Sequence, residues 1–391
     1  MLSWQTVKFS TICDVLSGFA FKSKLFGDTG LPIVRIRDVK RGLSKTFYNG
    51  EFDKKFILSN GDMLIGMDGD FNLAKWKGGK ALLNQRVCKI TPHVDKVDPN
   101  FLFYFLPLAL MEIWNATPFV TVKHLSAKSI NDIDVPLPPL SIQKKIAAVL
   151  EKADTLRGQC QQMEKELNTL SQSVFLDMFG DPVTNPKGWV TSNLEEQLEF
   201  LTSGSRGWAK HYDNNGHDIF IRIQNVLKDK MNLDDIQKIS APASQESKRT
   251  KVQDGDVLLS ITADLGRAGV VRNLKCNSYI SQHLALIRVK KDKIIPEFLS
   301  ALLVSPAGLN QFEQKNKGGT KAGLNFTDIR TLKISIPPIE LQDKFKLIKQ
   351  DIDTQLVEIK TVIETHNNFF NSLMQRAFKG ELALRKTKDV A

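Results

Sequence analysis

The chain contains one motif twice, and the two copies stand far apart. Residues 137–143 read Leu-Pro-Pro-Leu-Ser-Ile-Gln, and residues 336–342 read Ile-Pro-Pro-Ile-Glu-Leu-Gln, at an offset of 336 − 137 = 199 residues. Other matched segments keep the same order, beginning with Trp4 and Trp189 at an offset of 185. The 14-residue growth of the offset (199 − 185) is expected in surface loops of the second copy. The repeat indicates a tandem duplication that folds into two equivalent parts.

Each copy has the same succession of short apolar runs. Alternating or β-branched runs predict strands at 32–36 and 219–223, at 62–65 and 256–259, and at 85–90 and 283–289. Longer apolar patterns predict helices at 101–114 and 298–312. We therefore expect an α+β fold with two tandem α/β domains, each followed by a long helix.

A heptad pattern follows each copy of the motif. From Ile142 to Val174 apolar residues recur at alternating steps of 4 and 3, and the pattern returns 199 residues later. A 3.5-residue period held for more than four heptads predicts two long helices in an antiparallel coiled coil with pseudo-twofold symmetry. The alternative is two separate amphipathic helices, each lying on its own domain. The predicted seam comprises Ile142, Ile146, Val149, Leu156, Met163, Leu167, Leu170, Leu341, Phe345, Ile348, Ile352, Ile359, Val362, Phe369 and Leu373. The polar residues Gln355 and His366 also fall on this seam.

The domain boundaries follow from these patterns. Gly180 is a suitable residue to end the first long helix, and Pro182 blocks its continuation. The predicted parts are a first globular domain at 1–139, a helix at 140–180, a linker at 181–188, a second globular domain at 189–338, a helix at 339–384 and a polar tail at 385–391. Each helix would be roughly 55 Å long at about 1.5 Å per residue.

Charge favours an acidic partner. The net charge of +11 and the pI near 9.3 are typical of nucleic-acid-binding proteins, although a basic protein without such a partner has the same composition.

The four cysteines are scattered, with no CxxC pair, which fits a reducing cytoplasm. The chain shows no signal peptide, and its most apolar run, 101–111, is too short to cross a membrane.

Sequence motifs of catalysis are missing. The sequence has no GxGxxG after a strand, no phosphate-binding P-loop, no HExxH and no GxSxG. His211 and His217 lie six residues apart in a Gly/Asn-rich loop, which is a weak metal pair. We therefore expect a non-catalytic binding module with no metal site, rather than a stand-alone nuclease or methyltransferase. A coiled-coil adaptor for other proteins is the second alternative.

Basic and amide residues mixed with aromatic residues form clusters in the predicted loops of both copies. Lys and Arg suit phosphates, and Arg, Asn and Gln can make bidentate contacts with purine edges. The candidate DNA-binding residues are Lys22, Lys24, Arg35, Arg37, Asn72, Lys75, Trp76, Lys77, Lys80, Asn84, Gln85, Arg86, Lys123, His124, Arg206, Trp208, Lys210, Arg222, Gln224, Asn225, Arg267, Gln282, His283, Lys317, Thr320 and Lys321. For any single one of these residues, a solvated surface charge is the simpler interpretation; the clusters carry the prediction.

The duplicated Pro-Pro-x-x-x-Gln motif at the start of each heptad helix, the Phe-Gly-Asp-Pro linker at 179–182 and the Asn-Pro-Lys-Gly-Trp segment at 185–189 resemble the specificity subunits of type I restriction–modification systems. The resemblance covers essentially the whole chain. It implies that each globular copy is a target recognition domain for one half of a bipartite double-stranded DNA site, and that the coiled coil sets the gap. It also implies docking of two modification subunits that carry S-adenosylmethionine and methylate adenine N6, and of restriction subunits that use ATP and Mg²⁺. The chain itself would bind no cofactor.

Overall fold

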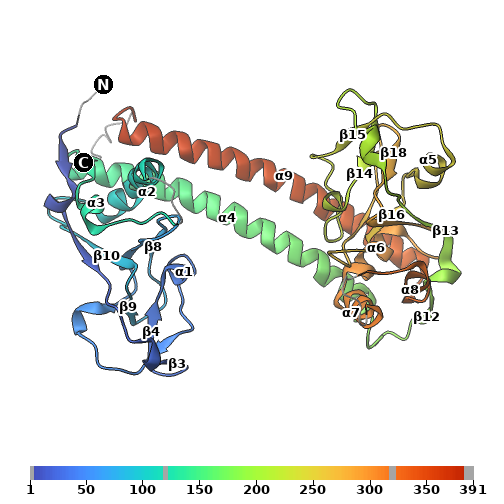
Figure 1. Cartoon of the computed structure of the whole chain (residues 1–391), viewed down its shortest axis with the longest axis horizontal. Coiled ribbons are helices and arrows are strands. Elements are labelled where there is room, and N and C mark those ends of the chain that lie inside the picture. The colour runs from blue at the N-terminus through green and yellow to red at the C-terminus, as the bar shows by residue number, and fades with distance from the viewer. Residues whose placement is uncertain (1–3, 118–121, 317–322, 383–391) are drawn as a thin grey trace, which may run out of the picture. The chain divides into compact units, whose positions relative to one another are not determined.

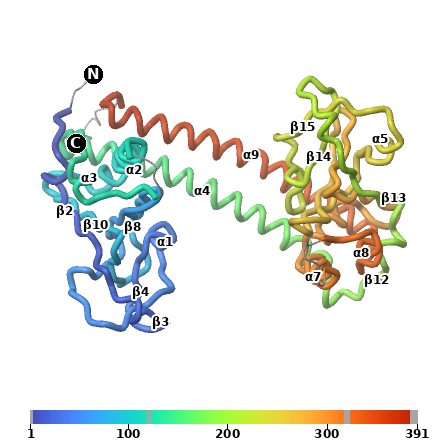
Figure 2. The backbone as a smooth tube through the Cα atoms, viewed as in Figure 1, coloured from blue at the N-terminus to red at the C-terminus, as the bar shows by residue number. Residues whose placement is uncertain are grey.

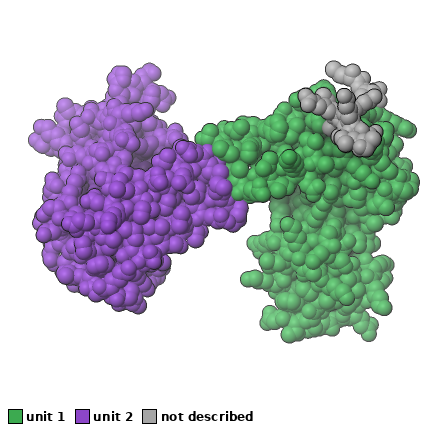
Figure 3. All heavy atoms as spheres, turned by 180° about the vertical axis from the view of Figure 1, so that it is seen from behind, with its two compact units in different colours: residues 1–161, 361–391 green, residues 162–360 purple. Residues whose placement is uncertain are grey.

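The computed structural model describes residues 4–117, 122–316 and 323–382. The chain forms two compact units, one of residues 1–161 and 361–391 and the other of residues 162–360 (Figure 3). Each unit holds one copy of the repeat together with about half of each long helix. The unit boundaries therefore fall within the helices, whereas the sequence-based division places the boundaries at the helix ends.

The N-terminal domain is built from three sheets in the first unit (Figure 1). The four-stranded sheet has the order β2 (Cys13–Ser17), β10 (Val87–Pro92), β7 (Met63–Gly66) and β8 (Leu73–Lys75). The five-stranded sheet has the order β3 (Phe26–Gly27), β5 (Phe47–Tyr48), β4 (Leu31–Val34), β9 (Ala81–Leu83) and β6 (Ile57–Leu58). The third sheet pairs β1 (Thr6–Lys8) with β11 (Asp134–Pro136), and the helices are α1 (Ile36–Val39), α2 (Pro99–Ala116) and α3 (Ala127–Asn131).

The C-terminal domain, in the second unit, repeats the four-stranded and two-stranded sheets but has a smaller third sheet. Its four-stranded sheet has the order β13 (Leu198–Ser203), β19 (Leu284–Val289), β16 (Val257–Ser260) and β17 (Ala268–Val270). Its three-stranded sheet has the order β15 (Gln237–Ile239), β14 (Asp218–Ile221) and β18 (Ser278–Ile280), and β12 (Val190–Asn193) pairs with β20 (Lys333–Ile336). The shorter helices are α5 (Gln245–Thr250), α6 (Pro296–Val304), α7 (Pro306–Lys315) and α8 (Phe326–Arg330).

The predicted strands and the first predicted helix are present, but the single helix predicted at 298–312 is two helices. Ser305 separates α6 from α7, and its hydroxyl accepts a hydrogen bond from Gly308 N at 3.3 Å. Pro306 then occupies the first turn of α7, where its missing N–H is not needed. The first copy has no matching break, so α2 runs uninterrupted through Pro107.

The two long helices, α4 (Leu140–Phe179) and α9 (Ile339–Phe378), pack against each other (Figures 1 and 2). In the first unit Cys160 Sγ lies 3.5 Å from Nδ1 of His366. In the second unit the rings of Phe175 and Phe179 lie 5.7 and 5.4 Å from the ring of Phe345. The end of α4 contacts the start of α9 in the second unit, whereas an earlier residue of α4 contacts a later residue of α9 in the first unit, so the pair is antiparallel. This confirms the coiled coil over two separate helices.

The predicted seam is only partly buried. Ile146, Phe345, Ile352 and Ile359 are buried, but about half of the seam residues are exposed. The exposed seam residues are Val149, Leu156, Met163, Leu170, Ile348, Val362 and Phe369. The buried face of each helix differs from the predicted seam because α4 and α9 also pack on the globular domains. Several helix residues belong to the hydrophobic core of one domain or the other. In the N-terminal domain they include Ala147, Leu150, Phe370, Met374 and Ala377, and in the C-terminal domain Phe175 and Phe179. Gln355 is likewise exposed, so it does not lie in the interface.

The linker after α4 is held to that helix. Gly180 has φ 77° and its N–H bonds to Leu176 O at 2.8 Å, as predicted for a residue that ends a helix. The indole N–H of Trp189 donates to Phe179 O at 2.8 Å. The linker is therefore fixed at the point where the second copy begins.

The described residues contain neither a membrane-spanning helix nor a metal-binding cluster. None of their helices combines the length and apolar character that a membrane span requires. Their His, Cys, Asp and Glu side chains form no group of three or more that could hold a metal ion.

Candidate nucleic-acid interface

Each domain has one pair of adjacent parallel strands among those described, and polar residues follow both strands of the pair. β4 runs parallel to β9 in the N-terminal domain, and β14 runs parallel to β18 in the C-terminal domain. Arg35 follows β4 and Asn84 follows β9, while Arg222 follows β14 and Ser281 follows β18. Because parallel neighbours end at the same sheet edge, residues far apart in sequence meet there. Such edges are common ligand sites.

A shallow pocket lies at this edge in each domain. The N-terminal pocket, of about 310 Å³, is lined by Arg35, Ile36, Arg37, Asn84, Gln85 and Arg86. The C-terminal pocket, of about 260 Å³, is lined by Ser205, Arg206, Gly207, Trp208, Ala209, Tyr212, Phe220, Arg222, Ile223, Gln224, Ser281, Gln282 and His283. Each pocket contains an arginine after the first parallel strand, and a polar residue followed by a glutamine after the second. Most of the other lining residues differ between the two pockets.

A matched glycine lets a third segment approach each strand end. A Cβ on Gly18 would lie 2.0 Å from Asn84 O, and one on Gly204 would lie 2.2 Å from Ser281 O. Any other residue would push these segments apart. Neither glycine is among the residues predicted from the sequence, although their offset of 204 − 18 = 186 fits the repeat.

Buried polar atoms without partners concentrate at these two sites. In the described part of the chain, seven buried side-chain nitrogen or oxygen atoms make no hydrogen bond, and five of them line the two pockets. They are Arg35 Nε, Asn84 Oδ1, Arg222 Nε, Ser281 Oγ and Gln282 Oε1. Since folded proteins rarely leave buried polar atoms unpaired, these atoms suit a ligand with polar edges.

Side-chain contacts hold one residue at each pocket. In the N-terminal domain Arg86 Nη1 lies 3.6 Å from an Asp68 carboxylate oxygen and 3.1 Å from His124 Nδ1, and Asp68 also bonds to His124. At the matched position, His283 Nδ1 lies 2.6 Å from Thr262 Oγ1. The two domains thus present different chemistry on the same frame.

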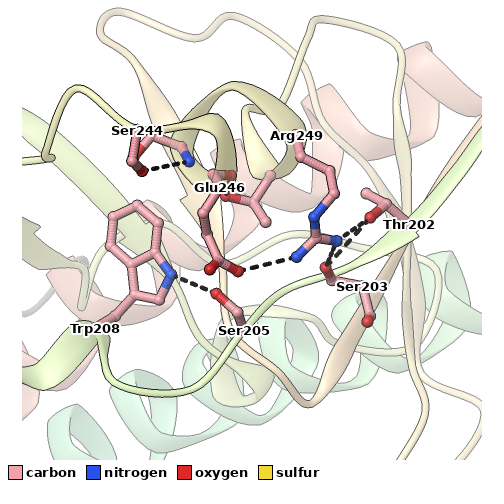
Figure 4. Close-up of polar contacts among 9 residues, drawn as sticks. Thr202, Ser203, Ser205, Trp208, Ser244, Glu246 and Arg249 are labelled. Atoms are coloured by element: carbon pink, nitrogen blue, oxygen red, sulfur yellow. Dashed lines mark hydrogen bonds and ion pairs between the residues drawn. The ribbon is translucent and has the colours of Figure 1, made fainter.

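Aromatic rings support the C-terminal pocket. Trp208 stacks on Phe220 at 5.3 Å and lies 5.1 Å from the Tyr279 ring. Its indole N–H donates to Ser205 Oγ at 3.0 Å (Figure 4). These contacts fix the loop that carries Arg206.

A charged pair lies beside this loop. Arg249 donates to Glu246 at 3.0 Å and to Ser203 O at 2.7 Å (Figure 4). A hydrogen bond from Ser205 and the nearby Arg249 lower the pKa of Glu246. Glu246 therefore stays ionised and holds the segment from Ser203 to Ser205 in place.

The structure gathers part of the predicted DNA-binding set. The predicted residues that line the two pockets are Arg35, Arg37, Asn84, Gln85, Arg86, Arg206, Trp208, Arg222, Gln224, Gln282 and His283. His124 contacts Arg86, and Lys210 lines a neighbouring cavity with Trp208. Exposed predicted residues outside the pockets are Lys22, Lys24, Lys77 and Lys80. Arg267 pairs with Asp264, Asn72 lines a different cavity, and Lys75 donates to Asn100.

Three of the predicted residues are buried and make interior contacts. Trp76 is 1% exposed and donates to Gly79 O at 2.7 Å. Lys123 is 7% exposed and donates to the backbone of Trp114. Asn225 is 1% exposed, and its amide bonds to Asn232 O and Asp235 O. The predicted Lys317, Thr320 and Lys321 lie outside the described residues.

Two tandem domains with matched polar pockets, joined by paired long helices, define a class of modular recognition proteins. The family model for the type I restriction modification DNA specificity domain matches residues 1–169 and 186–365. The chain therefore belongs to the family of type I restriction–modification specificity subunits. It contains two tandem recognition domains of this family.

Individual relatives agree. The chain is 31% identical to the EcoBI specificity subunit of Escherichia coli, with 97% of this chain and 86% of that protein covered. It is 23% identical to the MjaVIII specificity subunit of Methanocaldococcus jannaschii, with 91% and 87% covered. The solved S subunit from M. genitalium shares the fold at a TM-score of 0.59 and 12% identity, with 96% of each chain covered. A second solved chain, from work on complex assembly and conformational transition of the type I R-M system, shares the fold at a TM-score of 0.57 and 19% identity. The match covers 98% of this chain and 99% of that chain.

Proposed function

We propose that each globular domain reads one half of a bipartite double-stranded DNA target. The main support is the pair of pockets at matched strand ends, because buried unpartnered polar atoms concentrate there. The residues around this shared frame differ, with Arg86 in one domain and His283 in the other. Unlike pockets favour unlike half-sites, and hence an asymmetric target. The net charge of +11 favours the phosphate backbone as the sequence-independent part of the contact.

The long helices act as the spacer that sets the gap between the half-sites, and they dock two modification subunits. Support for docking comes from an apolar stripe on α4. Val149, Leu156, Met163 and Leu170 recur every seven residues and are 36%, 44%, 53% and 46% exposed. Regularly spaced exposed apolar residues on one helix face mark a protein-binding surface.

The chemistry belongs to the partner subunits in this proposal. The modification subunits bind S-adenosylmethionine and methylate adenine N6, and the restriction subunits use ATP and Mg²⁺ for cleavage. This chain binds none of these cofactors and supplies DNA recognition and assembly in the cytoplasm.

The test is selection of bound duplexes from a randomised library by the full chain co-expressed with its modification subunits. We expect two defined half-sites separated by an unspecified gap of constant length. Absence of any preference over random DNA would overturn the proposal. The affinity for DNA should also fall steeply with added salt, because phosphate contacts release counterions. This result would argue against the alternative of a protein adaptor whose positive charge has no role in DNA binding.

A further inference from the structure

Arg86 occupies an unusual backbone position. The Asn84–Val87 turn is closed by the bond from Val87 N to Asn84 O at 3.2 Å, and Arg86 has φ 71°. This third position of a turn normally holds Gly or Asn when φ is positive. The matched turn in the C-terminal domain is closed by Leu284 N and Ser281 O at 3.0 Å, and its His283 is not among the residues with positive φ. The N-terminal domain therefore keeps an arginine where the backbone favours glycine.

The contacts around Arg86 fix the direction of its side chain. Met67 N bonds to Arg86 O at 2.8 Å, Leu125 N to Met67 O at 2.7 Å, and Gly69 N to Lys123 O at 3.0 Å. These bonds tie the segments that carry Asp68 and His124 to the turn. Nη1 of Arg86 faces Asp68 and His124, whereas Nε and Nη2 make no hydrogen bond with any described residue. One edge of the guanidinium is held, and donors remain for a ligand.

The N-terminal pocket is rich in donors. Arg35, Arg37 and Arg86 line it together, and Arg35 Nε is buried without a partner. In the major groove guanine presents two acceptors, O6 and N7, whereas adenine pairs one acceptor with an N6 donor. A fork of arginine donors therefore matches guanine and opposes adenine. Both pockets also hold an unpartnered acceptor, Asn84 Oδ1 in the N-terminal pocket and Gln282 Oε1 in the C-terminal pocket, but the C-terminal pocket has His283 at the position that matches Arg86.

We infer that Arg86, held by Asp68, reads a guanine in the half-site bound by the N-terminal domain, with Asp68 as a positioning residue. The inference rests on the proposed DNA-reading function. The competing role for Arg86 is a phosphate contact, which would strengthen binding to all sequences alike.

The test measures affinities of the full chain, co-expressed with its modification subunits, for the selected duplex and its single-base variants. Arg86→Lys keeps the charge and loses the fork. It should lose roughly 10- to 100-fold of preference at one guanine while the slope of affinity against salt stays unchanged. Replacing that guanine by 7-deazaguanine, which lacks N7, should weaken the unsubstituted protein and leave Arg86→Lys unaffected.

Two further variants and one control complete the design. Arg86→Gly removes the side chain and suits the positive φ, so its loss of preference cannot be assigned to misfolding. Asp68→Asn should weaken the preference at the same guanine and at no other base. Arg330→Lys, in α8 outside both pockets, should change nothing.

The outcomes separate the two proposals. If Arg86→Lys and Arg86→Gly weaken all duplexes equally, or leave every base preference intact, Arg86 does not read a base. Bipartite selection by the unsubstituted chain would then still support the proposed function. If the unsubstituted chain selects no bipartite site, both proposals fail.

Discussion

Gln143 and Gln342 make the same three hydrogen bonds in the two domains. Gln143 accepts from Asp98 N at 2.8 Å and donates to Lys96 O and Pro138 O at 3.2 and 2.8 Å. Gln342 accepts from Ile295 N at 2.9 Å and donates to Lys293 O and Pro337 O at 3.0 and 2.8 Å. Each Gln is almost fully buried and ties the start of a long helix to the start of a domain helix. The glutamine of each Pro-Pro-x-x-x-Gln motif therefore fixes the long helix to its domain.

Gln342→Leu should destabilise the chain by about 2–3 kcal/mol, because it leaves the buried Ile295 N–H and two carbonyls without their partner. Denaturant unfolding of the full chain measures the loss. Gln355→Leu, on the exposed surface of the same helix, is the matched control and should change stability by less than about 0.5 kcal/mol. Equal effects of the two variants would contradict this role for Gln342.

A buried ion pair distinguishes the C-terminal domain. Lys349 Nζ lies 2.9 Å from an Asp229 oxygen and 3.4 Å from an Asp353 oxygen, and the matched residue in the first copy is Leu150 (349 − 199 = 150). Lys349→Leu should cost about 3 kcal/mol, because the Asp229 carboxylate, whose side chain is only 14% exposed, loses its cation.

The controls for Lys349→Leu test the ion pair itself. Adding Asp229→Asn should recover part of the loss, because it removes the unpaired charge and Asn tolerates the φ of 56° at this position. Lys344→Leu, exposed on the same helix, should be nearly neutral. A double variant no more stable than Lys349→Leu would contradict the explanation.

The stability lost in Lys349→Leu should depend on pH. Burial lowers the pKa of Lys349, but Asp229 and Asp353 outweigh it and raise that pKa above its usual range. The contribution of the Lys349 charge is therefore complete below the unfolded lysine value of about 10.4 while Asp229 is ionised, and it is lost as pH rises through the folded pKa.

In the variant the titrating group is Asp229. Burial raises the pKa of Asp229, so its charged form destabilises the fold at neutral pH and protonation at lower pH relieves the penalty. The difference in unfolding free energy between the unsubstituted chain and Lys349→Leu should be smaller at pH 5 than at pH 8. A constant difference between these two values would argue against a buried carboxylate as the cause.

Shortening the spacer should shorten the gap in the DNA target. Cys160 of α4 contacts His366 of α9, so residues 160–166 and 360–366 are matched segments for deletion. Deleting both segments removes one heptad, about 10 Å, from each helix and preserves the 3.5-residue repeat. We expect selected duplexes with the same half-sites and a gap about 3 base pairs shorter, or loss of binding. Binding at the original gap length would contradict the spacer role.

The exposed stripe on α4 should bind the modification subunit. Leu156→Glu with Met163→Glu places two charges on the stripe, and co-purification of the modification subunit should be lost while the melting temperature of the chain is unchanged. Thr155→Glu with Asn168→Glu adds the same charge to exposed positions off the stripe and should retain the subunit. Equal retention by both pairs would place the docking surface elsewhere.

Sequence patterns were most informative where the signal is periodic or repeated. The duplicated strand order, the long helices and the end of α4 at Gly180 were predicted from residues close in sequence. Prediction was weaker for the inward face of the helices. A seven-residue repeat fits more than one rotation, and contact with the domains selects Leu150 rather than Val149. Trp76 illustrates the same difficulty in a loop, because an aromatic residue among lysines has the same pattern whether it is exposed or buried.

By itself, the sequence determined the duplication, the fold class and the residue types available to each recognition domain, because these depend on order and spacing along the chain. The tertiary structure alone decided which residues share a pocket. Arg35 and Asn84 meet because β4 and β9 are parallel neighbours, and Gly18 permits the close approach of a third segment. Asp68 reaches Arg86 through backbone pairing between distant loops. These contacts are non-local, so no spacing rule along the chain encodes them.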